Sequence, residues 1–170
     1  MSLRLLLLSA LAGISLSAQA QPRPPFDCQN SAPHRAFDFW LGEWSVADSS
    51  GKAQGQNTIR AIQNGCAVQE QWTSVRGGTG QSVNYYHPGR GQWHQIWTDG
   101  GASIIDIRGG LEEGSMVMVG TIYYLAESIE KEFRGRWTPL EDGRVRQFFE
   151  ERDETGEWKT WFEGYYTRNQ

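Results

Sequence analysis

The chain has 170 residues, of which 38% are hydrophobic, and a formal net charge of −4. This length suits one domain, and the mild acidity argues against a nucleic-acid-binding protein, which needs a basic surface. Beyond the N-terminal segment no apolar run is long enough to cross a bilayer, so we expect no stable membrane insertion.

Residues 1–20 have the features of a signal peptide that is removed on export. Arg4 supplies a positive start, Leu5–Leu16 is a short apolar stretch, and Ala18-Gln19-Ala20 matches a small-x-small cleavage site. The alternative is an N-terminal membrane anchor, but the apolar run is short for an ordinary span. We therefore expect a periplasmic or secreted protein.

The mature chain carries two cysteines, Cys28 and Cys66. An even pair in an exported protein is expected to be oxidised, and a bridge closing a loop of this length stabilises the fold by about 4 kcal/mol in the chain-entropy model. The alternative is a reactive or metal-binding thiol, but no CxxC or Cys/His spacing supports it. We predict a structural Cys28–Cys66 disulfide.

The first elements of the mature chain are an extended, Pro-rich leader at residues 21–30 and a short helix. Ser31 can cap this helix, Pro33 suits its first turn, and Phe37, Trp40 and Leu41 fall on one apolar face. Such a face must be buried, and the open end of a barrel is a natural place for it.

Ten strands are predicted from Glu43 onward. Gly-rich turn signals separate them, among them Asn64-Gly65 and Gly109-Gly110, and no gap has room for a crossover helix, so antiparallel pairing is expected. The strands span about residues 43–48, 54–62, 66–75, 80–87, 92–98, 102–108, 115–124, 128–138, 144–152 and 158–168.

An open sheet of this size would leave two exposed edges, and closure removes them. We therefore predict an all-β fold for residues 31–170. It is an antiparallel up-and-down β-barrel of about ten strands, a single domain, with the short N-terminal helix plugging one end.

Strand parity indicates which residues face the interior. Trp93, Gln95 and Trp97 share one face of their strand, and Glu70 and Trp72 share one face of another. Mixed aromatic and polar groups suit a ligand-binding lumen better than a core filled by its own side chains. The candidate ligand-binding residues are Glu70, Trp72, Asn84, Tyr86, Trp93, Gln95, Trp97 and Gln147. If they face outward instead, their polar members are ordinary solvated residues.

The segment Phe37-Asp38-Phe39-Trp40-Leu41-Gly42-Glu43-Trp44, with Gly65-Cys66, Gln69-Glu70-Gln71-Trp72 and Trp93-x-Gln95-x-Trp97, resembles the calycin superfamily. That superfamily includes lipocalins, fatty-acid-binding proteins and nitrobindins, and the pattern looks most like a family of exported bacterial calycin-like proteins of unsettled role. The resemblance implies that Trp44 packs across the closed end of the barrel, under an Arg from the last strand. Arg168 matches that residue, and both would be structural.

Four arginines, Arg134, Arg136, Arg144 and Arg146, flank the turn at Glu141-Asp142-Gly143. Fatty-acid-binding relatives use inward arginines to hold a carboxylate. The opposite face of this strand carries Phe133, Gly135 and Trp137, however, and the apolar face should be the buried one. We expect the arginines to form a solvated basic strip.

We expect no metal, cofactor or catalytic residue. A nitrobindin-like haem site would need a histidine near the C-terminus, whereas His94 is the last histidine of this chain. No nucleophile or phosphate-loop motif is present. The sequence therefore predicts a barrel that binds a small hydrophobic or amphipathic molecule. Two alternatives stay open: an enzyme using Glu70 as an acid–base, and an envelope interaction module with a filled barrel.

Overall fold

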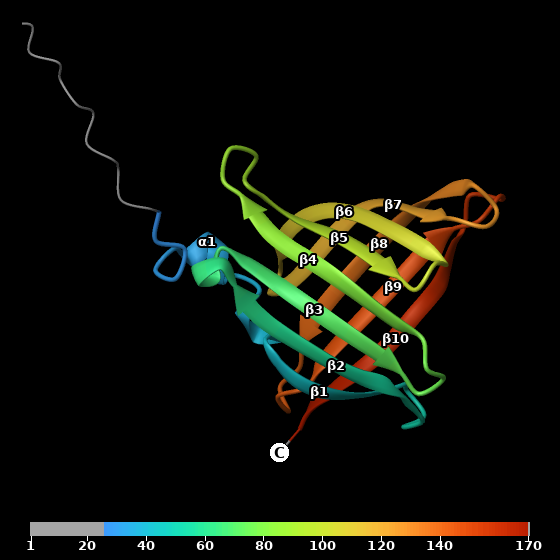
Figure 1. Ribbon diagram of the computed structural model, residues 1–170, viewed down its shortest axis with the longest axis horizontal. Helices are drawn as coiled ribbons and strands as arrows, with labels where there is room; N and C mark the ends of the chain where they lie inside the picture. Colours follow the sequence, from blue (N-terminus) through green and yellow to red (C-terminus); the bar gives the residue numbers. More distant parts are fainter. Residues whose placement is uncertain (1–25, 170) are drawn as a thin grey trace, which may run out of the picture.

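The predicted strands close into one antiparallel barrel (Figure 1). The computed structural model describes residues 26–169, so the predicted signal peptide at 1–20 and residues 21–25 of the leader lie outside the described residues. The strands follow one another around the barrel in chain order, and β1 closes it against β10. They are β1 Gly42–Ala47, β2 Ala53–Ile62, β3 Ala67–Ser74, β4 Thr79–His87, β5 Gln92–Asp99, β6 Ser103–Glu112, β7 Ser115–Tyr124, β8 Ile129–Pro139, β9 Val145–Arg152 and β10 Trp158–Arg168. The predicted fold class is confirmed.

A short helical segment plugs one end of the barrel, at the left in Figure 1. It consists of α1, Ala32–Arg35, and the 3₁₀ turn η1, Asp38–Trp40. Phe37 and Trp40 are fully buried, and their stacked rings reach Trp137 of β8. Ser31 is the N-cap residue of α1, as predicted, but its hydroxyl is hydrogen-bonded to the His34 ring at 2.8 Å and caps no backbone N–H.

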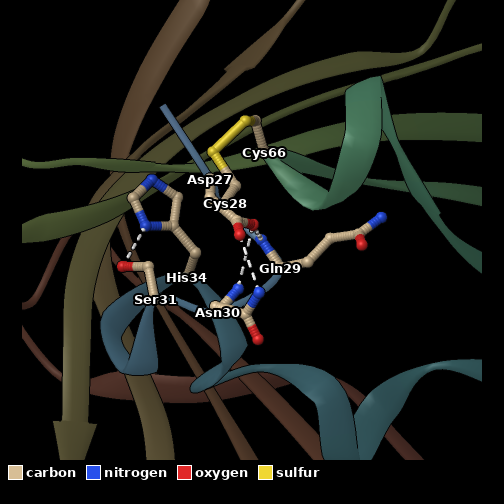
Figure 2. The surroundings of a disulfide bond; sticks show 7 residues. All are labelled: Asp27, Cys28, Gln29, Asn30, Ser31, His34 and Cys66. Carbon is tan, nitrogen blue, oxygen red and sulfur yellow. Dashed lines mark hydrogen bonds between the residues drawn. A yellow bond between two sulfur atoms is a disulfide. The ribbon is translucent and has the colours of Figure 1, made fainter. Parts of the chain in front are cut away.

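The disulfide Cys28–Cys66 fastens this plug to the barrel wall (Figure 2), as predicted. Cys66 follows the 3₁₀ turn η2, Gln63–Gly65, which joins β2 to β3. On the other side of the bridge, the Asp27 carboxylate accepts the backbone N–H groups of Gln29 and Asn30, so the chain turns at Asp27–Asn30. The plug is therefore held covalently as well as by its buried rings.

The predicted turn at Gly109-Gly110 was wrong, because β6 runs through both residues to Glu112. The turn lies at Glu113-Gly114, where both residues have positive φ, 49° and 80°. A side chain at Gly109 would collide with the backbone of β7 at Val117. This glycine therefore permits close strand approach rather than a turn.

In the described part of the chain, no helix has the length and apolar character needed to cross a membrane.

Candidate ligand-binding site

A cavity of about 290 Å³ occupies the half of the barrel away from α1. Its mouth lies where β2 begins and β3 ends, with Gln54, Ser74, Val75 and Arg76 at the rim. Its walls are largely aromatic and its floor is polar. The volume lies near the lower end of the range for small-molecule sites.

The aromatic walls leave this space open because their rings lie over glycines. The Trp72 indole covers Gly55, and the Trp97 indole covers Gly80, so closely that a Cβ at either glycine would overlap the ring. Phe149 lies over Gly135 in the same way. Glycine in a strand interior often marks such a close approach. Large side chains are thus held against the wall instead of filling the centre.

A β-bulge adds two further rings to the wall. The register between β10 and β9 shifts between Thr160 and Phe162. As a result both Trp161 and Phe162, which are consecutive in sequence, line the cavity. Strict alternation would send one of them outward, and bulges commonly re-aim a side chain next to a site.

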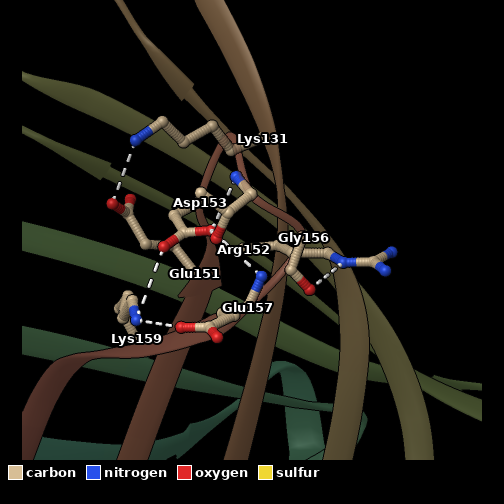
Figure 3. A network of polar contacts seen from close by, with 8 residues as sticks. Lys131, Glu151, Arg152, Asp153, Gly156, Glu157 and Lys159 are labelled. Atoms are coloured by element: carbon tan, nitrogen blue, oxygen red, sulfur yellow. Dashed lines mark hydrogen bonds and ion pairs between the residues drawn. The ribbon is translucent and has the colours of Figure 1, made fainter.

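A series of hydrogen bonds holds Trp161 at the mouth. Its indole N–H donates to the Tyr124 hydroxyl at 3.0 Å, and that hydroxyl donates to Glu151. Glu151 also accepts from Lys131 at 3.0 Å, within the charged network at this end of the barrel (Figure 3). Burial, with the neighbouring Glu151 carboxylate, raises the pKa of Tyr124 well above its usual value, so the tyrosine stays a hydrogen-bond donor.

The floor of the cavity is a buried hydrogen-bond cluster around Glu70. The Glu70 carboxylate is 3% exposed, accepts Asn57 Nδ2 on Oε1 at 2.7 Å, and accepts the Ser82 hydroxyl on Oε2 at 2.7 Å. Asn57 Nδ2 also donates to the Tyr166 hydroxyl at 3.2 Å, and Tyr166 donates to Gln147. The cluster thus joins β2, β3 and β4 to β9 and β10.

Burial decides the protonation of this floor. It raises the pKa of Glu70 to about 7, although the hydrogen bonds from Asn57 and Ser82 oppose the shift. Burial and then the charge of Glu70 raise the pKa of Tyr166 far above its usual value. Near neutral pH the floor therefore holds one carboxyl close to its midpoint and one neutral phenol.

The structure places five of the eight predicted ligand-binding residues on the cavity: Glu70, Trp72, Gln95, Trp97 and Gln147. Asn84 lies behind the floor, where it accepts Gln95 Nε2 at 2.8 Å and donates to Ser82 at 2.9 Å. Their role in binding a ligand stays a prediction.

Trp93 and Tyr86 lie on the plug side of the barrel instead. Trp93 donates its indole N–H to the Pro33 carbonyl at 3.0 Å and packs edge-on to Phe37. Tyr86 packs against the His34 ring. Parity places Trp93 inside the barrel correctly, but the plug already fills that depth of the interior.

Trp44 and Arg168 pack together at the plugged end. The guanidinium lies 4.2 Å from the indole centre and donates to the Leu41 carbonyl at 2.8 Å. A side chain at Gly42, whose φ is 145°, would overlap this guanidinium. Glycine before the tryptophan therefore makes room for the arginine, which favours the structural role implied by the resemblance.

The arginine strip lies on the outer wall. Arg134 pairs with Glu150 at 2.6 Å and Arg146 with Glu163 at 2.7 Å, while Phe133 and Trp137 of the opposite face are fully buried. His94 also lies on the outer wall, where its ring stacks on Tyr85. Burial under neighbouring side chains, and then the charge of Arg108, lower the pKa of His94. In residues 26–169, no three His, Cys, Asp or Glu side chains cluster as metal ligands would.

Sequence reasoning missed several lining residues: Arg76, Phe149, Trp161, Phe162 and Tyr166. Gln147 is the strand partner of Trp137, and Phe149, two residues further on, lies on the same face of its strand. This alternation could have indicated Phe149 from the sequence. The bulge that turns Trp161 inward has no comparable signal. The Trp97 indole N–H, which is buried beside the cavity without a partner, was also not foreseen.

No protein-family model matches the sequence, and the search of curated proteins finds no relative. The geometry of the barrel and its cavity therefore carries the functional argument.

Proposed function

We propose that the protein is an exported, calycin-like carrier or sensor that binds one small, partly hydrophobic molecule inside its barrel. The observation that carries this proposal is the cavity, which has aromatic walls, a polar floor and a mouth at the end opposite the plug. Apolar walls with a few convergent polar groups are typical of small-molecule sites. The disulfide and the predicted signal peptide support a periplasmic or secreted location.

The alternative of a filled barrel that serves only as an interaction module leaves the cavity unexplained. The alternative of an enzyme draws on Glu70, whose pKa of about 7 suits general acid–base catalysis near neutral pH. A carboxyl group alone selects no reaction, however, and the rest of the lining is mainly aromatic, aliphatic or amide-bearing, with Ser74 and Arg76 at the rim. Binding is therefore the better-supported function.

A fluorescence titration with N-phenyl-naphthylamine, a neutral aromatic probe, tests the proposal. Two tryptophan variants form a matched pair, because Trp97 lines the cavity whereas Trp158 lies on the outer wall under Arg134. We expect saturable binding, with an affinity that Trp97→Ala changes severalfold and Trp158→Ala leaves unchanged. Absence of saturable binding, or equal effects of the two variants, would contradict a cavity site. Native mass spectrometry of protein from its own compartment can then identify a retained ligand.

A further inference from the structure

Glu70 is a buried residue whose carboxylate has unfilled hydrogen-bond acceptor positions. A carboxylate offers about four acceptor positions, and the protein fills one on each oxygen, from Asn57 and from Ser82. Glu70 itself lines the cavity. Beside it, the buried Asn57 Oδ1 has no donor. Glu70 therefore has acceptor positions to spare, and it borders a space that a ligand can enter.

Within the part of the chain that the structure describes, no Lys, Arg or His side chain pairs with this carboxylate. The strands packed against it present neutral groups: Asn57 from β2, Ser82 from β4 and the Tyr166 phenol from β10. Among residues 26–169, the basic residue that lines the cavity is Arg76, which is exposed on the turn after β3 at the mouth. A buried charge without a partner is costly, so a cationic ligand would relieve the cost.

The walls above Glu70 are also suited to a cation. Trp72, Trp97 and Trp161 line the same cavity, with Phe149 and Phe162 between them. The face of an aromatic ring attracts an organic cation, most strongly for tryptophan, and more strongly where water is excluded. An aromatic enclosure over a carboxylate favours a positively charged ligand more than a neutral or negative one.

On the proposed function, that the cavity binds a small molecule, we propose that this molecule is an organic ammonium ion. Its charged nitrogen lies against Glu70, and its apolar body lies along the tryptophan walls. A neutral alcohol would use the same acceptors without balancing the charge. A carboxylate ligand would be repelled by Glu70 at the floor.

Calorimetric titration with three ligands of one body tests the charge: phenylbutylamine, phenylbutanol and phenylbutyrate. At about pH 8 a carboxyl with a pKa of about 7 is mostly ionised. We expect the amine to bind on the order of tenfold more tightly than the alcohol, and the acid to bind most weakly. An alcohol or acid that binds wild-type protein as tightly as the amine does overturns the inference.

Glu70→Gln keeps the shape of the side chain and removes its charge. We expect this variant to lose the preference for the amine and to retain the affinity for the alcohol. The control is Glu43→Gln, which removes one carboxylate from an exposed pair on the outer wall and should change neither affinity. If Glu70→Gln does not fold, the three ligands on wild-type protein still decide.

Two failures are distinguishable. If N-phenyl-naphthylamine binds the cavity but the amine shows no preference, the ammonium inference fails and the binding function stands. If neither the neutral probe nor any of the three ligands binds, both fail.

Discussion

Aromatic side chains are packed differently in the two halves of the barrel. At the plugged end, Phe37, Trp40 and Trp137 pack face or edge against one another and fill the interior. At the mouth, Trp72 and Trp97 lie against Gly55 and Gly80 at the wall, and the centre is open. Aromatic residues thus make a core in one half and a wall in the other, and in the wall the closest rings lie over glycines.

The polar groups differ in the same way. The plugged end has a guanidinium stacked on an indole, with its charge near solvent. The cavity floor has a buried carboxylate, that of Glu70, which takes part in no ion pair within residues 26–169. We infer that the first half was arranged for stability and the second tolerates a cost in stability for the sake of binding. Four experiments test this difference between the two halves of the barrel.

Trp44→Ala should have the largest effect on stability. Trp44 is fully buried, donates to the Trp40 carbonyl at 2.9 Å and supports Arg168. Removing a packed tryptophan costs about 3–5 kcal/mol, which urea unfolding of the purified variant would measure. A loss below about 1 kcal/mol would mean that the plugged end is not the stabilising half.

Reduction of the Cys28–Cys66 disulfide should have the second largest effect on the free energy of unfolding. The bridge spans 38 residues, so the chain-entropy model gives about 4 kcal/mol. Urea unfolding with and without reductant measures the difference, and the Cys28→Ser, Cys66→Ser double variant controls for side reactions. Thiol titration of the unreduced, denatured protein should find no free thiol. Two reactive thiols per chain would contradict the bridge.

Glu70→Gln should change how stability depends on pH. The folded pKa of Glu70, about 7, is above its unfolded value near 4.5, so the folded state binds the extra proton between these values. The Glu70 contribution to stability therefore falls as pH rises through this window, by on the order of 2–3 kcal/mol. We expect the variant to gain stability relative to wild type from about pH 5 to about pH 8. If the difference in stability between the variant and wild type stays constant with pH, the pKa of Glu70 is not raised by burial, and its side chain is in contact with water.

Gly80→Ala should cost the least stability, about 1–2 kcal/mol, while it impairs binding. The added methyl overlaps the Trp97 indole and forces it into the cavity. The control is Gly110→Ala in β6, where the methyl meets no atom within 4 Å. Titration with N-phenyl-naphthylamine compares the two. Equal affinities would show that the wall glycine does not keep the cavity open.

The regular spacing of the strands and the turn residues between them were enough to predict the barrel. Turn glycines at regular spacing, no crossover segment and a Gly-x-Trp after an apolar helix each constrain local geometry, and the closed meander satisfies all of them. Gly109-Gly110 was misread because the same residue type serves both turns and close strand approach. Sequence alone does not separate these two uses.

The cavity was less accessible to prediction because closure brings distant residues together. Asn57 and Tyr166, 109 positions apart, meet only because β1 joins β10. The alternation of side chains along the strand correctly predicted that Trp93 points into the barrel. It did not predict how far along the barrel axis Trp93 lies. Depth depends on how far the plug enters, and that is a tertiary property.

The described chain starts and ends at the plugged end. Phe26 packs on His34 of the plug, and the Asn169 N–H donates to the carbonyl of Glu43, at the start of β1, at 2.9 Å. A tether attached after the last residue would thus leave the mouth facing solution. On the proposed binding function, protein immobilised through a tether beyond Asn169 should exchange small molecules at the same rate as free protein.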